Sequence, residues 1–507
     1  MNLKKYLKST DLGITVLIIA GILVVLNFFS YQIFYRWDLT QNKDYSISKV
    51  SKRAVGELED IVNIKVYFSN DLPNQLITLK QEVGDILDEY QNYSNGNIRV
   101  EFINPEEIGE QELLAKGIPA LQFNVLEKDK YQVVKGYLGI IVEYGGKKEV
   151  LPIVQNTDNF EYQVTLAIKK VTSEDTITIG YIVSNGASDL ENELSIANKK
   201  LQELYEVRPI DLSTAKEVAQ DINTLLIVGP KEEFSEEQLK MIDSFLMRGG
   251  SLLLMVDGVK VEEGLFASSN DLNLDNLLEA YGVKLNHDLV LDTSSGMASF
   301  YSGFITFSIN YPLWPKIIKQ GFDQDNAIVS KLESITLPWS SSVDILTDKQ
   351  DESNRISYLA KTTNRAWRQT ESYDLNPQQQ FIPANDSKQY SLAISVAGTF
   401  NSAFGQERTD SGKLIIVGDS DFISDNFLQQ PGDNLVFFQN LVDSLSLDED
   451  LINIRSKGVS DRPIKEITDG QKTLARYFNV FGLTLIVIIF GMIRYFIRRR
   501  RRFVDEI

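Results

Sequence analysis

The chain has 507 residues, 43% of them apolar, and a formal net charge of −19 at pH 7. This acidic balance argues against binding to nucleic acid or to anionic lipid headgroups through bulk charge. Cysteine is absent, which excludes disulfides, thiolate catalysis and cysteine-ligated zinc or iron–sulfur clusters. A chain of this length and apolar content can bury two or three domain cores without covalent cross-links.

Two apolar segments lie near the ends of the chain. Residues 12–30 carry no charge and follow three lysines, which predicts a membrane-spanning helix over 12–33. A cleaved signal peptide is the alternative, but the bulky residues that end the segment do not suit a cleavage site. The second segment predicts a spanning helix over 477–496, with a buried core helix before a basic tail as the alternative.

The basic residues at the two ends predict the orientation in the cytoplasmic (inner) membrane. Residues 1–11 and the basic tail 497–507 are expected in the cytoplasm, and the large body between the helices outside it. We expect Trp37 to lie at headgroup depth and Arg494 to reach toward the headgroups. We expect the tail to contact the cytoplasmic leaflet through one run of basic residues. These are Arg498, Arg499, Arg500, Arg501 and Arg502.

The alternation in residues 45–155 predicts a βαβ unit followed by antiparallel strands. A helix with an apolar face from Leu76 to Tyr90 separates strands at 62–68 and 98–103. Three antiparallel strands are then predicted, at 121–126, 137–144 and 148–154. This order is similar to the thioredoxin-like arrangement. Without cysteine, such a domain serves as a scaffold or docking surface.

Residues 161–450 alternate strands and helices, which predicts a doubly wound parallel sheet of the flavodoxin or class I amidotransferase type. The predicted strands are 176–183, 224–228, 252–256 and 413–417. Residues from about 258 to 412 lack this alternation and are predicted to be an irregular insertion, and 451–476 a juxtamembrane linker. The predicted fold class is therefore α/β, with two extracytoplasmic domains flanked by one transmembrane helix at each end.

Carboxylates follow two of the predicted strands. Asp257 and Asp419 come directly after apolar runs, so we expect them at the carboxyl edge of the sheet, where open α/β folds usually bind ligands. With Asp421 and Asp425 nearby, they suit a hard cation or sugar hydroxyls. The alternative is that Asp419 and Asp421 form Asx turns and cap the next segment. We favour the turns, because the spacing matches no metal loop, and expect no cofactor.

Catalytic motifs are weak in this sequence. His287 is the only histidine, and no Gly-x-Ser-x-Gly elbow supplies a nucleophile beside it. Carboxylate pairs for glycoside hydrolysis are possible in so acidic a chain, but no pair is singled out. A Gly-x-x-x-x-Gly-Lys-Ser/Thr phosphate loop is absent, so ATP hydrolysis would come from a partner. We therefore predict a protein that is not an enzyme.

Aromatic residues stand beside prolines in the predicted insertion. Tyr311 and Trp314 lie in one such segment and Trp339 in another. Exposed, they would stack on sugars or on a partner protein. Buried, they would form a local core under long loops. We favour the core, because tryptophan is highly buried on average.

The motifs resemble those of the gliding-motility-associated ABC transporter auxiliary proteins, the GldG-like family, nearly from end to end. No motif is specific alone, but their order over most of the chain is. They are Trp37-Asp38-Leu39-Thr40, Tyr45-Ser46-Ile47-Ser48, Leu72-Pro73, Gly249-Gly250-Ser251-Leu252-Leu253 with Asp257, Tyr311-Pro312-Leu313-Trp314-Pro315, Gly398-Thr399-Phe400, Ser402-Ala403-Phe404, Val417-Gly418-Asp419-Ser420-Asp421-Phe422, Asn434-Leu435-Val436-Phe437-Phe438-Gln439-Asn440, Ile454-Arg455-Ser456-Lys457 and Arg462-Pro463.

The resemblance implies an accessory subunit of an ABC-2-type transport system, beside a permease and a separate P-loop ATPase. It implies complex contacts near the second membrane helix at Arg455 and Arg462, and a role in export, the cell envelope or gliding, with a polysaccharide or lipid-linked substrate. The chain departs from the family at residues 184–187, Ser-Asn-Gly-Ala, where many members have a Gly-His-Gly-Glu-like loop. The alternative function is an extracytoplasmic glycan-binding or glycan-processing protein.

Overall fold

The computed structural model describes residues 21–22, then 46–447 except 71, 128–129, 158, 174–176, 263 and 303–304, and finally 476–478, 490–492 and 494–495. The chain divides into two units, Met1–Val459 and Ser460–Ile507. In the second unit, the described residues are short helical pieces, and Arg494 is exposed on one of them.

Most of the predicted membrane-associated residues lie outside the described part of the chain. They include all of 12–33 except residues 21–22, most of 477–496, and Trp37, Arg455, Arg462 and residues 498–502. In the segments that the structure describes, no helix combines the length and the apolar character needed to span a bilayer.

A four-stranded sheet forms the core of residues 46–172, which we call the N-terminal lobe. Its strand order is β2-β1-β5-β6, with β1 parallel to β2 and antiparallel to β5. The predicted βαβ unit is present, because α3 connects β1 to β2. The elements are α2 (Lys49–Gly56), β1 (Val62–Phe68), α3 (Asn74–Tyr93), β2 (Ile98–Phe102), η1 (Pro105–Glu107), α4 (Glu110–Ala115), β3 (Leu121–Glu127), β4 (Lys130–Gly136), β5 (Leu138–Tyr144), β6 (Lys147–Leu151) and α5 (Phe160–Thr172).

Local sequence accounts for most of this lobe. Ser48 caps α2 by accepting a hydrogen bond from the Ser51 N–H at 3.2 Å. Alternate residues of β1 are buried in one core with the apolar face of α3. The strand predicted at 121–126 is present, but it pairs with a different strand from the one expected. As β3, it forms a separate hairpin with β4, which the prediction missed, and does not join the main sheet.

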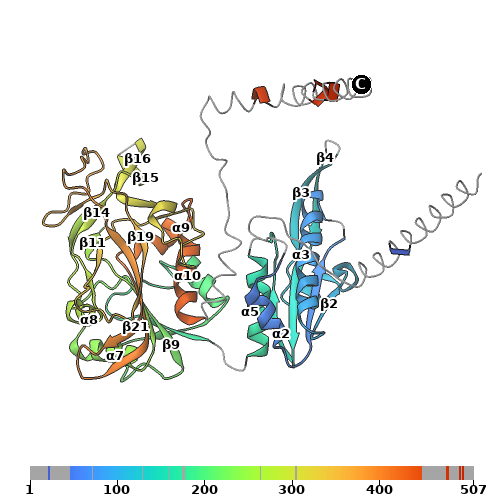
Figure 1. Cartoon of the computed structure of the whole chain (residues 1–507), viewed down its shortest axis with the longest axis horizontal. Coiled ribbons are helices and arrows are strands. Elements are labelled where there is room, and N and C mark those ends of the chain that lie inside the picture. Colours follow the sequence, from blue (N-terminus) through green and yellow to red (C-terminus); the bar gives the residue numbers. More distant parts are fainter. Residues whose placement is uncertain are drawn as a thin grey trace, which may run out of the picture. The chain divides into compact units, whose positions relative to one another are not determined.

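A seven-stranded sheet, which includes the strands labelled β9, β19 and β21 in Figure 1, organises the rest of the first unit. Its strand order is β19-β21-β22-β10-β9-β7-β8. Strands β8, β7, β9, β10 and β22 are parallel, as predicted for a wound sheet. Strands β21 and β19 extend it in antiparallel fashion. The strands are β7 (Thr178–Ile182), β8 (Glu206–Ile210), β9 (Ile222–Val228), β10 (Ser251–Met255), β19 (Arg355–Lys361), β21 (Ser391–Asn401) and β22 (Arg408–Val417).

Two features of this sheet correct the sequence prediction. Strand β8 was not predicted, because the sequence of its five residues, Glu-Val-Arg-Pro-Ile, has no clear alternation and contains a proline, which an edge strand tolerates. Strands β19 and β21 fall inside the segment 258–412 that was predicted to be irregular. That segment therefore contributes two strands of the main sheet.

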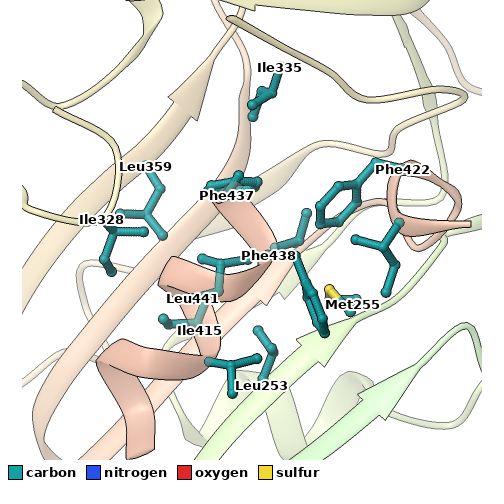
Figure 2. Close-up of a cluster of buried hydrophobic side chains, with 14 of the residues drawn as sticks. Leu253, Met255, Ile328, Ile335, Leu359, Ile415, Phe422, Phe437, Phe438 and Leu441 are labelled. Atoms are coloured by element: carbon teal, nitrogen blue, oxygen red, sulfur yellow. The ribbon is translucent and has the colours of Figure 1, made fainter. Parts of the chain in front are cut away.

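Helices cover both faces of the sheet, because alternate strand residues point to opposite sides. Leu253 and Met255 of β10 point to one face of the sheet, where they share a buried core with Phe437 and Phe438 (Figure 2). Leu252 and neighbouring alternate residues belong to the opposite core. Each large apolar side chain buried in this way contributes ~1.5–3 kcal/mol. The helices are α6 (Ser195–Gln202) and α10 (Asn434–Ser446) on the first face, and α7 (Glu236–Met247) and α8 (Asp275–Ala280) on the second.

The ends of α7 show how sequence signals set its length. Ser235 and Gln238 form a reciprocal capping box at its start. Gly249 follows the helix with φ +91°, a conformation that favours glycine, and the chain then enters β10.

Small sheets make up the rest of the insertion. They pair β11 with β12, β13 with β18, β14 with β20, and β16 with both β15 and β17. Their elements are β11 (Val259–Glu262), β12 (Phe266–Ser269), β13 (Val283–Leu285), β14 (Leu289–Leu291), β15 (Ser295–Ser302), β16 (Ile305–Ile318), η2 (Lys319–Gly321), β17 (Ser334–Thr336), β18 (Val343–Ile345) and β20 (Trp367–Gln369), and after the insertion η3 (Asp421–Ile423) and α9 (Asp425–Leu428).

Candidate functional site

Three aspartates gather at the carboxyl edge of the parallel strands. Strands β10 and β22 are parallel neighbours with Met255 opposite Val417, so the loops that follow them leave the same edge side by side. One carboxylate oxygen from each of Asp257, Asp419 and Asp421 lies within 4.8 Å of the others. We call these residues the acidic trio. The sequence predicted Asp257 and Asp419 at this edge, and the structure brings them together.

Hydrogen bonds orient two members of the acidic trio. The Asp257 carboxylate accepts from the Ser420 N–H at 2.9 Å and from the Ser420 hydroxyl at 2.5 Å. Asp419 Oδ1 accepts from the Asp421 N–H at 2.7 Å, so the Asx turn favoured from the sequence is present. Asp419 is fully buried, yet its Oδ2 has no hydrogen-bond partner among the described residues.

Burial disfavours the ionised form of all three carboxyls, and repulsion from neighbouring carboxylates adds to this at Asp419 and Asp421. Burial, followed by the charges of Asp421 and Asp257, raises the pKa of Asp419 well above its usual value. Burial raises the pKa of Asp257, and the hydrogen bonds from Ser420 oppose this. Burial, followed by the charge of Asp257, raises the pKa of Asp421 to about 7. Lys231 acts in the opposite direction on both Asp257 and Asp421.

The neighbouring loops approach the acidic trio closely. Gly229, in the loop after β9, has φ +56°, and a Cβ there would lie 2.5 Å from Ser188 Oγ and 2.9 Å from Ser420 Oγ. Strand order reverses between β7 and β9, which is where open α/β sheets form a crevice. The loops after β7, β9, β10 and β22 therefore converge at one edge. The sequence reasoning missed Ser188, Ser420 and Lys231, although each follows a strand that it predicted.

Asp425, the fourth carboxylate considered from the sequence, has a different role. Its carboxylate accepts from the Ser195 N–H at 3.1 Å, the Ser195 hydroxyl at 2.5 Å and the Ile196 N–H at 2.9 Å. These groups open α6, so Asp425 caps that helix from a distant part of the chain.

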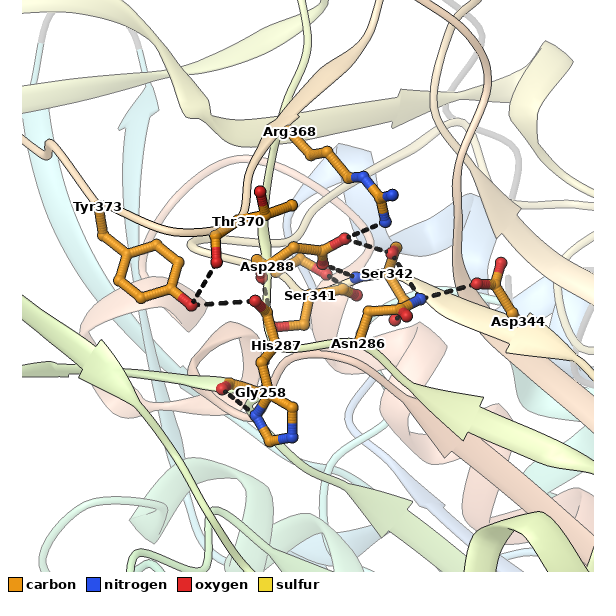
Figure 3. Close-up of polar contacts among 11 residues, drawn as sticks. Gly258, Asn286, His287, Asp288, Ser341, Ser342, Asp344, Arg368, Thr370 and Tyr373 are labelled. Atoms are coloured by element: carbon orange, nitrogen blue, oxygen red, sulfur yellow. Dashed lines mark hydrogen bonds and ion pairs between the residues drawn. The ribbon is translucent and has the colours of Figure 1, made fainter. Parts of the chain in front are cut away.

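His287 lies in a network that joins the insertion to the sheet. Its Nδ1 contacts the Gly258 carbonyl oxygen at 3.0 Å and Ser269 Oγ at 3.2 Å. Among the described residues, no carboxylate bonds to the ring. Figure 3 shows the adjacent Asp288 carboxylate between Ser342 and Arg368. A Ser-His-Asp arrangement is therefore not assembled at this histidine.

The Asp288 carboxylate is fully engaged. It accepts from the Ser342 N–H and hydroxyl, each at 2.7 Å, and pairs with the Arg368 guanidinium at 3.1 Å. Nearby, Ser341 donates its hydroxyl to the Asp288 carbonyl oxygen at 2.7 Å, and its N–H to the Gly418 carbonyl oxygen at 2.6 Å. This network ties the insertion to the loop that carries Asp419.

The aromatic residues predicted as a local core form one. Tyr311 is fully buried and donates its hydroxyl to the Leu375 carbonyl oxygen at 2.6 Å. Trp314 is 8% exposed and meets Trp339 edge to face, with ring centroids 5.6 Å apart. The ring of Phe427 packs against that of Trp314, with the ring centroids 4.8 Å apart. Little of the Tyr311 and Trp314 ring surface is open for stacking on a sugar.

A family described as an ABC-type uncharacterized transport system matches residues 177–443, more than half of the chain. The chain belongs to this family. Membership of the ABC-type transport family supports an accessory, transport-associated role, and the matched segment contains the whole acidic trio. A domain of unknown function matches residues 41–143.

One protein is similar to this chain in sequence, and two solved structures are similar to part of it. An uncharacterized protein of Borreliella burgdorferi is 26% identical over 487 residues, which cover 92% of this chain and 94% of that protein. The N-terminal domain of IFT52 is 15% identical with a TM-score of 0.37, over 53% of this chain and 98% of that one. A β-galactosidase from Rahnella sp. R3 is 12% identical with a TM-score of 0.28, over 58% of this chain and 34% of that one. These two structural likenesses carry no argument about function.

Proposed function

We propose that this member of the ABC-type transport family is a non-enzymatic, membrane-anchored auxiliary subunit of an ABC-2-type transporter. In this proposal, it works beside a separate permease and a separate P-loop ATPase. The observation that carries the proposal is the family match over residues 177–443, supported by the GldG-like motifs that extend the resemblance toward both ends of the chain.

The proposed membrane arrangement rests on the sequence. Apolar segments at 12–33 and 477–496, flanked by basic residues, support two spans with both termini in the cytoplasm. The body between them would then be extracytoplasmic. The run at residues 498–502 would contact the inner leaflet and the ATPase side of the complex, and Arg455 and Arg462 the permease side.

The N-terminal lobe is proposed to be a thioredoxin-like scaffold. The strand order β2-β1-β5-β6 supports this, with a βαβ unit, a following antiparallel pair and then α5. Because the chain has no cysteine, the lobe would dock a partner and carry out no thiol chemistry. Export of a polysaccharide or lipid-linked substrate, with or without gliding, is the process we propose for the complex.

Affinity capture tests this function. The full chain, carrying an affinity tag, is solubilised in mild detergent from membranes in which another ABC complex is followed as a control. We expect a permease and a P-loop ATPase to co-purify in stoichiometric amounts. Recovery of the chain alone, while the control complex stays intact, would contradict the proposal.

The glycan-binding alternative is less well supported. It rests on the aromatic segments and on the carboxylates at the sheet edge, and of the aromatic residues Tyr311 is fully buried and Trp314 is 8% exposed. We therefore prefer the transporter subunit. The alternative is tested by titrating the purified chain with cell-wall and polysaccharide fragments. Binding that is lost when Trp339, which is only partly buried, is substituted would support the glycan-binding function.

A further inference from the structure

A buried oxygen in the acidic trio has no partner. Asp419 is 0% exposed, and its Oδ1 is used in the turn to Asp421 while its Oδ2 receives no hydrogen bond from any described group. Leaving a buried acceptor unsatisfied costs about 1–3 kcal/mol, and more when it is charged. Two further carboxylates within 4.8 Å increase this cost, because they carry the same charge. The ionised cluster is therefore unfavourable unless a proton or a positive ligand compensates for its charge.

We propose that the acidic trio binds a divalent metal cation through oxygens of Asp257, Asp419 and Asp421. Carboxylates are the ligands that hard cations prefer, and three of them, when ionised, more than balance the +2 charge of such an ion. Asp419 would contribute its unpartnered oxygen from the buried side. Asp257 and Asp421 are half-buried, so their side of the cluster is open to an arriving ion and to the water molecules that complete its coordination.

The ligand set favours Ca²⁺ over Mg²⁺. The carboxylate oxygens of the acidic trio all lie within 4.8 Å of one another, so one bound ion can reach all three. Mg²⁺ demands near-ideal octahedral geometry with bonds of about 2.0–2.1 Å, whereas Ca²⁺ accepts bonds of about 2.3–2.6 Å in a flexible, irregular geometry. Three carboxylates from two loops form such an irregular set, so we expect Ca²⁺ to bind more tightly.

The surroundings hold the ligands in place and limit the charge. Ser420 bonds to both oxygens of Asp257 through its N–H and hydroxyl, which fixes that carboxylate in orientation and leaves lone pairs available to a metal. Lys231 offsets part of the negative charge. Burial raises the pKa of all three carboxyls, and neighbouring carboxylates raise it further at Asp419 and Asp421, so a cation bound among them would relieve both effects.

Calcium titration of the full chain tests the site. The purified protein is stripped with EDTA, exchanged into chelator-free buffer and titrated with CaCl₂ or MgCl₂ by calorimetry, with thermal unfolding followed in parallel. We expect saturable Ca²⁺ binding, weaker Mg²⁺ binding, and a rise in unfolding temperature with Ca²⁺. Asp419→Asn and Asp421→Asn should each weaken Ca²⁺ binding at least about tenfold, because one of three charged ligands is lost.

Asp211→Asn is the matched control. Asp211 follows β8 at the same edge of the sheet and also forms a turn, accepting from the Ser213 N–H at 2.9 Å and hydroxyl at 2.6 Å. It belongs to no carboxylate cluster among the described residues, so its substitution should leave Ca²⁺ binding unchanged. NaCl at equal ionic strength separates general screening of an acidic protein from specific binding.

Two results would overturn the proposal. One is the absence of saturable Ca²⁺ or Mg²⁺ binding by the unsubstituted chain. The other is equal Ca²⁺ affinity in the unsubstituted protein and both trio variants, which would place the ion elsewhere on the acidic surface. The chain is tested without partners, so neither result depends on whether a permease is recovered with it.

Discussion

Buried aspartates in the insertion and at the edge of the main sheet have different surroundings. In the insertion, Asp288 and Asp292 are each surrounded by donors that satisfy their carboxylates. At the edge of the main sheet, Asp419 lies beside Asp257 and Asp421 with one oxygen unpaired. A carboxylate with complete partners fixes the structure around it. One left incomplete among like charges is the place where we propose that a cation binds.

The largest effect is expected at Asp292. This residue is fully buried and accepts from the Thr363 N–H and hydroxyl, each at 2.6 Å, and from the Ser294 N–H at 3.1 Å. Asp292→Ala should lower the free energy of unfolding by about 3–5 kcal/mol, because these buried donors lose their acceptor. Urea denaturation followed by circular dichroism measures the change. A loss below about 1 kcal/mol would show that the surrounding donors find other partners.

A smaller loss is expected at Asp288. Its partner Arg368 is 38% exposed, so the guanidinium regains water when the carboxylate is removed. Asp288→Ala should therefore cost about 2 kcal/mol, mainly from the two bonds of Ser342. Arg368→Ala, measured in the same way, should cost less than Asp288→Ala. The reverse order would mean that the ion pair outweighs the buried hydrogen bonds.

Asp425 should have an effect of about 1 kcal/mol, the usual value of a helix cap. Asp425→Ala removes the acceptor from the Ser195 and Ile196 N–H groups at the start of α6. Amide hydrogen exchange over Ser195–Gln202 should increase in the variant, and exchange over α7 should not. Equal changes in both helices would indicate a global loss of stability and no specific cap.

The smallest change in the free energy of unfolding is expected at Asp419, and it should not be a loss of stability. In EDTA, Asp419→Asn keeps an oxygen for the Asx turn and removes one like charge from the acidic trio. The free energy of unfolding should stay the same or rise by about 1 kcal/mol. Asp419→Ala, which also removes the turn, should be less stable than Asp419→Asn. If Asp419→Asn lost as much stability as Asp292→Ala, the two regions would be alike and the acidic trio purely structural.

Many of the helices and strands could be predicted from the sequence, because the spacing of apolar residues depends on local secondary structure. The βαβ unit of the N-terminal lobe, the strands β7, β9 and β10 and the start of α7 at Ser235 all follow from apolar spacing and caps. It missed β8 and mistook the segment that holds β19 and β21 for irregular chain. Strands such as these are defined by pairing with distant partners, and their own sequences are weakly patterned.

The candidate site also has features that the sequence predicts and features that only the tertiary structure shows. The sequence by itself determined that Asp257 and Asp419 end apolar strands and that Asp419 forms a turn, because strand endings and Asx turns depend on neighbouring residues. Only the tertiary structure decided that β10 and β22 are neighbours, that Asp425 turns away to cap α6, and that Asp419 Oδ2 has no partner. Those outcomes depend on contacts between segments more than 150 residues apart, which no local pattern encodes.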